Sequence, residues 1–143
     1  MIPVELHNKI KAQLERDEGR RSKLYYDSLN IPTIGIGINL KEGLSSNAVD
    51  FLFDEKLNII FNELVLCLPW SLNLDEARLG ALINMAYNLG VPRLLGFKKL
   101  LAALQSEQWG EARIQALNSI WSSQVGSRAM RVAQQFETGV WNA

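Results

Sequence analysis

Glu18 is the residue whose position points most directly to chemistry. It follows an amphipathic pattern in which Leu6, Ile10 and Leu14 recur at every fourth position, and Gly19 after it can end a helix in a left-handed conformation. A carboxyl group in the last turn of a helix faces the negative end of the helix dipole, which favours its protonated form, and partial burial would add to this effect. Since a general acid must be protonated near neutral pH, Glu18 is a candidate proton donor. The alternative is a solvated helix end.

Two further candidates follow in the next fifteen residues. Asp27 lies nine positions after Glu18, at the end of an apparent strand and before a polar turn, where an Asp commonly hydrogen-bonds its own backbone. Thr33 shares one face of the next strand with Gly35 and Gly37. Because glycine weakens a strand and packs nothing, this face either admits a flat ligand such as a sugar ring or belongs to a tightly twisted hairpin. Both interpretations stay open.

Changes in apolar periodicity define the elements that must position these side chains. Residues 3–17 are predicted to form an amphipathic helix. Residues 24–27 and 33–38 alternate with a period of two, which predicts a small antiparallel hairpin with residues 28–32 as its turn. After Gly43 the pattern is helical throughout.

The helical part is divided by prolines, glycines and polar turn residues. Its first helix is expected to have Ser45 or Ser46 as its N-cap. That helix ends before Pro69, and a second one opens at a capping box formed by Asn73 and Glu76. Shorter helices are predicted over residues 93–106, 109–122 and 127–137. The fold class is therefore α+β, predominantly helical with a small antiparallel β-hairpin and a groove between the two parts.

Composition restricts the function classes. The chain has 143 residues, of which 48% are hydrophobic and 21% charged, as is typical of one globular domain with its own core. A formal net charge of zero disfavours a basic surface for nucleic acid. The single cysteine, Cys67, is expected to be a buried apolar residue. With His7 as the single histidine, the chain cannot form the usual Cys/His zinc site.

The distribution of apolar residues predicts no stable membrane insertion. No stretch is apolar enough to span a bilayer, and the first residues lack the pattern of a secretion signal. We therefore expect a protein that is made in a cytoplasm without a signal peptide.

Taken together, the candidate residues resemble the lysozymes of tailed bacteriophages of the T-even type, in glycoside hydrolase family 24. The family pattern is a Glu, an Asp nine positions later and a Thr six positions beyond it, in a Thr-Ile-Gly-x-Gly context, and Glu18, Asp27 and Thr33 match it. The resemblance continues through the helical half, at residues 84–90, 96–97, 109, 121, 128–131 and 138–141. It covers nearly the whole chain.

The resemblance implies a single lysozyme-like domain over residues 1–143 with a cleft between two lobes. The small lobe would take approximately residues 18–44, and the helical lobe approximately residues 45–143 together with the N-terminal helix. Two departures concern the small lobe. Ile38 stands where a His is usual, and residues 40–45 are shorter than the corresponding family region, so a third strand is expected to be trimmed.

The resemblance also implies roles for individual residues. Glu18 would protonate the glycosidic oxygen of the bacterial wall polymer, while Asp27 and Thr33 position or activate the attacking water. Arg128 resembles the Arg that pairs with the catalytic Glu, with a surface helix-end charge as the alternative. Substrate-binding positions are expected at Tyr87, Asn88, Gly35 and Gly37, although core packing explains Tyr87 equally well. The match implies structural roles for Trp109, Trp121 and Trp141.

The predicted function is a muramidase that cleaves the β-1,4 bond between N-acetylmuramic acid and N-acetylglucosamine in peptidoglycan, without a cofactor, as a monomer. We expect it to act on the wall after a separate protein has opened the membrane. One alternative is a catalytically silent module of the same fold that binds cell wall or a protein partner. Another is a lytic transglycosylase, which uses one Glu and which the presence of Asp27 argues against.

Overall fold

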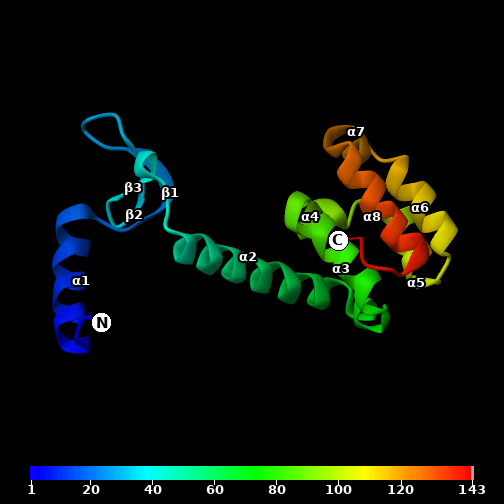
Figure 1. The fold of residues 1–143 in the computed structure, drawn as a ribbon, viewed down its shortest axis with the longest axis horizontal. Helices are drawn as coiled ribbons and strands as arrows, with labels where there is room; N and C mark the ends of the chain where they lie inside the picture. The colour runs from blue at the N-terminus through cyan, green and yellow to red at the C-terminus, as the bar shows by residue number, and fades with distance from the viewer. Residues whose placement is uncertain (143) are drawn as a thin grey trace. The chain divides into compact units, whose positions relative to one another are not determined.

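The computed structural model describes residues 1–142 (Figure 1). The chain forms two compact units, Met1–Asp50 and Phe51–Ala143. The first unit holds the first helix and all the strands, and the second holds most of the long helix α2 and every later helix. The predicted grouping of the N-terminal helix with the helical lobe, within one domain, stays a prediction. No described helix is both long and apolar enough to cross a membrane.

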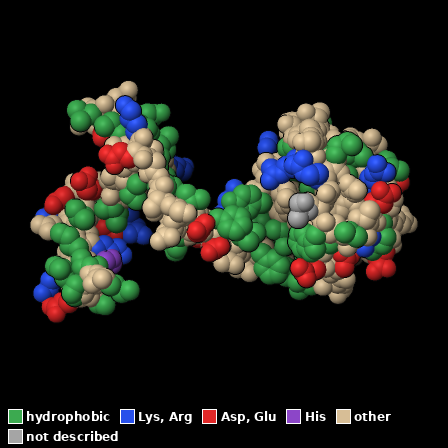
Figure 2. All heavy atoms as spheres, viewed as in Figure 1, with side chains coloured by type: hydrophobic (Ala, Val, Ile, Leu, Met, Phe, Trp, Pro, Cys, Tyr) green, Lys and Arg blue, Asp and Glu red, His purple; other side chains and the backbone are tan. Residues whose placement is uncertain are grey.

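The first unit begins with helix α1 (Val4–Glu18), which ends where the sequence predicted. Gly19 has a φ of +79°, and its N–H donates to the carbonyl of Glu15. None of the side chains of α1 is buried, and apolar side chains remain at the surface of this unit in Figure 2. Ile10 and Leu14 line a small cavity of about 250 Å³ together with Ile36, so the helix runs beside the turn that contains Ile36.

The sheet has three antiparallel strands in the order β1 (Arg21–Tyr26), β2 (Pro32–Gly35) and β3 (Ile38–Asn39). The third strand is therefore present, and its length of two residues fits the expectation of a trimmed strand. The sequence predicts one strand over residues 33–38, but Gly35 and Gly37 both have a positive φ, +67° and +66°. These two glycines reverse the chain, so that Ile38 pairs with Ile34. A short 3₁₀ helix, η1 (Leu40–Glu42), follows.

The second unit is a helical bundle. Its elements are α2 (Ser46–Cys67), which begins in the first unit, η2 (Pro69–Asn73), α3 (Glu76–Leu89), α4 (Val91–Leu94), α5 (Lys98–Gln105), α6 (Trp109–Leu117), α7 (Ile120–Val125) and α8 (Ser127–Thr138). Helix α8 packs on α3, α6 and α7, and α5 packs on α6. The largest fully buried apolar side chains all belong to this unit, with Trp121, Phe136, Leu64, Leu82 and Met85 among them.

Several local predictions are corrected in the second unit. Asp75, not Asn73, caps α3, because its carboxylate accepts the N–H of Arg78. Cys67 is exposed rather than buried. The helices predicted over residues 93–106 and 109–122 are each divided in two. Ser45 does cap α2, since its hydroxyl accepts the N–H of Ala48 at 3.2 Å.

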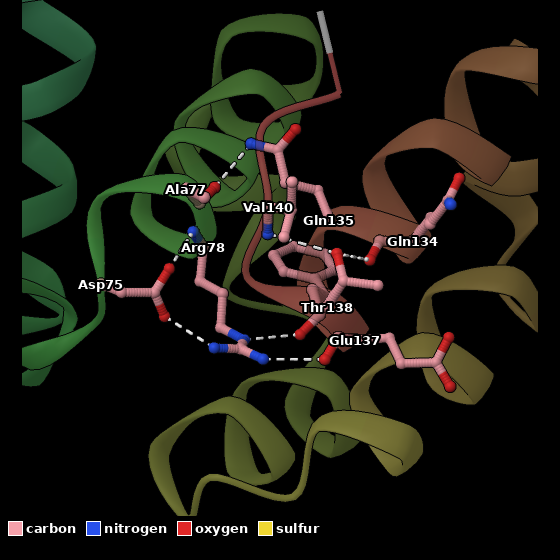
Figure 3. Close-up of polar contacts among 9 residues, drawn as sticks. Asp75, Ala77, Arg78, Gln134, Gln135, Glu137, Thr138 and Val140 are labelled. Carbon is pink, nitrogen blue, oxygen red and sulfur yellow. Dashed lines mark hydrogen bonds and ion pairs between the residues drawn. The ribbon is translucent and has the colours of Figure 1, made fainter.

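A single arginine joins the start of α3 to the end of α8 (Figure 3). The Arg78 guanidinium donates to the carbonyls of Phe136 and Glu137, both at 2.7 Å, and to the Asp75 carboxylate at 2.8 Å. It also lies 3.8 Å from the centre of the Trp109 ring. Burial raises the pKa of the Asp75 carboxyl, but hydrogen bonds from Arg78 and its positive charge outweigh burial, so this pKa lies below its ordinary value.

Two of the predicted structural tryptophans contact other parts of the second unit. The indole of Trp121 is buried and donates to the carboxamide oxygen of Asn88 at 2.9 Å. The Trp141 ring lies so close to Gly80 that a side chain there would overlap it. These contacts connect α3 with the C-terminal third of the chain.

Candidate active site

The Glu18 side chain lies against the sheet of the first unit. Glu18 is the last residue of α1 and is exposed, so the partial burial that the sequence left open is absent. Its carboxyl group lies directly over Gly37, in the turn between β2 and β3. A Cβ added at Gly37 would be 2.8 Å from Oε2 of Glu18 and 2.9 Å from Cδ.

Asp27 has the turn role that its sequence context suggested. Its Oδ1 accepts the N–H groups of Leu29 and Ile31, both at 2.9 Å, and its own N–H donates to the carbonyl of Ile31 at 3.0 Å. These bonds fix the connection between β1 and β2. Within residues 1–142, Oδ2 receives no hydrogen bond, so the carboxylate keeps one oxygen for another partner.

Thr33 is held by the same peptide group as Asp27. Its hydroxyl donates to the carbonyl of Ile31 at 2.8 Å, and Thr33 is the one buried side chain among residues 1–50. Because the hydroxyl proton is used in this bond, the oxygen lone pairs remain as acceptors. The Ile31 backbone thus brings Asp27 and Thr33 together. No sequence pattern pointed to Ile31, because these contacts use only its backbone.

Strand β2 connects this pair to Glu18. Thr33 lies in the strand, close to the β1–β2 turn that Asp27 fixes, whereas Gly37 lies in the turn that follows the strand. The three predicted catalytic residues therefore belong to one unit, with Thr33 in β2, Asp27 in the turn before it and the Glu18 side chain against the turn after it. Gly35 lies at the end of β2, with the side chain of Ile38 as its nearest neighbour.

Three other predicted site residues belong to the second unit. Arg128 donates to the carboxamide of Asn84 at 3.0 Å. The Tyr87 ring packs 5.8 Å from the ring of Phe53, with the ammonium of Lys56 4.0 Å from its centre. Arg128, Asn84, Tyr87 and Phe53 line a common pocket of about 460 Å³. That Arg128 pairs with Glu18 stays a prediction.

Asn88 is not among the residues that line this pocket. Its carboxamide oxygen accepts the Trp121 indole, so it has a structural contact, and its sugar-binding role stays a prediction. Asn84 is the residue that the sequence argument left without a role, although it is a polar residue one helical turn before Tyr87. In the described part of the chain, no group of three or more His, Cys, Asp or Glu side chains could hold a metal ion.

Comparison with known proteins identifies the family. Residues 15–135, which include all three candidate catalytic residues and most of the bundle, match the family described as "Phage lysozyme". The chain belongs to the phage lysozyme family. This membership confirms the predicted lysozyme-like α+β fold and the predicted enzyme class, so the protein is a glycoside hydrolase, a peptidoglycan hydrolase of the muramidase type.

Individual relatives support the same assignment over nearly the full length. "Probable T4-type lysozyme 2" of Dictyostelium discoideum is 32% identical, and the match covers 91% of this chain and 94% of the relative. "Probable T4-type lysozyme 1" of the same organism is 30% identical over 94% of this chain and 96% of the relative. The "Pre-baseplate central spike protein Gp5" of Enterobacteria phage T4 is 28% identical over 88% of this chain but only 27% of its own length.

Proposed function

We propose that the enzyme hydrolyses the β-1,4 bond between N-acetylmuramic acid and N-acetylglucosamine, with Glu18 as the acid and a water held by Asp27 and Thr33. The observation that carries this proposal is the fixing of Asp27 and Thr33 on the two polar groups of Ile31, which leaves Oδ2 and the hydroxyl lone pairs available. Family membership supplies the class of substrate.

In the proposed reaction, Glu18 gives its proton to the glycosidic oxygen as the bond from that oxygen to C1 breaks. Positive charge then develops on C1 and the ring oxygen. Asp27 accepts a proton from the water through Oδ2 while the water oxygen forms a bond to C1. The second water hydrogen donates a hydrogen bond to the Thr33 hydroxyl oxygen and stays on the new C1 hydroxyl group. The water attacks C1 from the face opposite to the leaving oxygen, so the product sugar has the inverted anomeric configuration.

The remaining predicted site residues would bind rather than react. We assign Arg128 to orienting the Glu18 carboxyl, and Tyr87, Asn88, Gly35 and Gly37 to contacts with the sugar. Tyr87 has the strongest support among the residues of the second unit, because its ring lines a pocket with two hydrogen-bonding side chains, Asn84 and Arg128.

The acid assignment is tested by the turbidity of purified cell walls with the wild type and with Glu18→Gln. We expect the loss of turbidity to slow by about 10²–10⁴-fold, since that is the usual contribution of a general acid. Glu5→Gln is the matched control, because Glu5 is an exposed glutamate on the same helix. Equal rates for Glu18→Gln and the wild type would remove Glu18 from the mechanism. No activity in the wild type would favour the silent wall-binding module.

Product analysis separates hydrolysis from transglycosylation. Mass spectrometry of the released muropeptides should show reducing ends that contain the elements of one water molecule. An anhydro-sugar product would show that the enzyme is a lytic transglycosylase and not a hydrolase. The anomer formed first, observed by NMR at early times, tests inversion directly.

We also propose that the enzyme is made in the bacterial cytoplasm, acts as a monomer and reaches the wall after another protein opens the membrane. The likeness to part of a phage spike protein favours a second route, in which the enzyme is delivered as part of a phage particle. Expression in a bacterial host with and without membrane permeabilisation distinguishes these routes. Lysis that needs permeabilisation supports the first, and co-purification with phage particles supports the second.

A further inference from the structure

Gly37 is in unusually close contact with the Glu18 side chain. A Cβ built on Gly37 would lie 2.8 Å from Oε2, 2.9 Å from Cδ and 3.1 Å from Cγ of Glu18. Carbon atoms in favourable van der Waals contact are about 3.5–4.0 Å apart. The whole carboxyl end of Glu18 therefore occupies the space that any side chain at position 37 would need.

The other glycines of the first unit with a positive φ lack this contact. Gly19 and Gly43, with φ of +79° and +80°, have nothing within 4 Å of an added Cβ. Gly35, with φ of +67°, has only the side chain of Ile38, at 3.4 Å. A positive φ explains the presence of glycine at all four positions. It does not explain the contact with Glu18, which is particular to Gly37.

We propose that Gly37 is a positioning residue for Glu18, because its bare backbone forms the surface on which the carboxyl group rests. This inference rests on the proposed role of Glu18 as the acid. From the sequence, the glycine face either admits a flat ligand or belongs to a tightly twisted hairpin, whereas the group that approaches Gly37 in the structure is the Glu18 carboxyl. Catalytic groups must be held within about 0.5 Å of the productive position, so the contact bears directly on the rate.

The contact also predicts which property a substitution would change. The atoms that a new Cβ would meet are at the end of a flexible side chain and not in the backbone. A methyl group at position 37 should therefore displace the Glu18 carboxyl and leave the sheet intact. The effect should be mainly on kcat, because the methyl group displaces the proton donor and so weakens transition-state stabilisation, whereas the Gly37 backbone, which would make the assigned sugar contact, stays in place.

The first experiment compares Gly37→Ala with Gly43→Ala on a soluble oligosaccharide substrate. Both alanines would adopt a positive φ in the same unit, so both should lower Tm by a similar few degrees. We expect kcat to fall by about 10–100-fold in Gly37→Ala with KM changed by less than about two-fold, since a displacement of about 1 Å can cost about 10²-fold. Gly43→Ala should keep kcat within about two-fold of the wild type. Equal kcat in all three proteins, or a change confined to KM, would overturn the proposal.

The second experiment uses a shorter acid. We expect Glu18→Asp to lower activity. Because its carboxyl group lies one methylene group farther from position 37, adding Gly37→Ala to this variant should lower kcat by less than about three-fold. An equal loss of kcat in the Glu18 and Glu18→Asp backgrounds would show that the two positions act independently, and would count against a positioning role.

A spectroscopic readout separates this inference from the proposed function. The ¹³C resonance of the Glu18 side-chain carboxyl should move in Gly37→Ala and stay unchanged in Gly43→Ala, whatever the activity. If Glu18→Gln is fully active while the resonance moves, the contact stands and the acid role fails. If the resonance does not move, the positioning role fails even when Glu18→Gln is inactive.

Discussion

At position 27 the two oxygens of one carboxylate have different surroundings. Oδ1 holds the β1–β2 turn through two backbone N–H groups, while Oδ2 is without a bonded partner in the described residues. A substitution that keeps an acceptor oxygen at the Oδ1 position and removes the negative charge at Oδ2 therefore distinguishes the structural role of Asp27 from its proposed catalytic role. Asparagine does this, because its carboxamide oxygen can accept the same two N–H groups.

We predict that Asp27→Asn lowers kcat by at least about 10²-fold, since a general base contributes about 10²–10⁴-fold. Its Tm should stay within about 2 °C of the wild type, because loss of less than about 0.5 kcal/mol has a small effect on a chain of this size. Muropeptide release and thermal unfolding are the measurements. Asp27→Ala, which removes both oxygens, should lose activity and stability together. If Asp27→Asn keeps the wild-type turnover, Asp27 only stabilises the turn and is not the base.

Part of this residue-scale description could be predicted from the sequence. The resemblance of Glu18, Asp27 and Thr33 to the phage lysozyme pattern led to the proposed active site, and the turn role of Asp27 followed from its polar context alone. The contact between Glu18 and Gly37 could not be predicted, because it depends on where α1 lies beside the β2–β3 turn. No local pattern encodes that placement.

At the scale of elements, the sequence located the helices and strands better than their ends. Strand periodicity over residues 33–38 predicted one strand, because alternation in side-chain type does not show the sign of φ at its glycines. Likewise, the helical pattern continues through residues 117–120, where Ser119 caps a new helix by accepting the N–H of Ser122. Such breaks depend on side-chain to backbone bonds that a periodicity does not report.

Arg78 is predicted to stabilise the contact between α3 and α8. It is 12% exposed and donates to two carbonyls at the end of α8, which otherwise lack partners within their helix. We expect Arg78→Met to reduce the free energy of unfolding by about 2–4 kcal/mol, since bonds to charged donors are worth about 1.5–3 kcal/mol each but part of the side-chain packing is kept. Urea denaturation measures the change.

The control for this prediction is Arg113→Met. Arg113 also contacts Glu137, through an ion pair of 3.3 Å between side chains that are both nearly half exposed. Its loss should cost less than about 1 kcal/mol, as for other surface pairs. Similar losses in the two variants would mean that the Arg78 bonds to the α8 carbonyls contribute little.

At the scale of the molecule, buried apolar area is distributed unequally between the two units. Every buried apolar side chain among the described residues lies between Ile60 and Phe136, whereas Thr33 is the buried residue of the first unit. We predict that native-state hydrogen exchange shows the strongest protection in α3, α5 and α8. The amides of β1, β2 and β3 should exchange through openings of lower free energy. Equal protection in both units would contradict this prediction.

The unequal distribution bears on function, because the proposed acid, base and water-binding residues are all on the less buried unit. A core substitution such as Leu82→Ala should cost about 3–5 kcal/mol. Its effect should be to lower the amount of folded protein rather than kcat per folded molecule. Positions such as Gly37, in contrast, should change kcat with little change in the bundle.

The bonds of Arg78 also have a consequence for folding during translation. Its acceptors, the carbonyls of Phe136 and Glu137, are 58 and 59 residues later in the chain. Gln135 likewise donates to the carbonyl of Ala77 from a distance of 58 residues. While α8 is still inside the ribosome, a nascent chain therefore cannot form the hydrogen bonds that hold the start of α3. The helical unit should reach its native state only once that helix has emerged, so stalled or prematurely released chains would be recognised by proteases as unfolded.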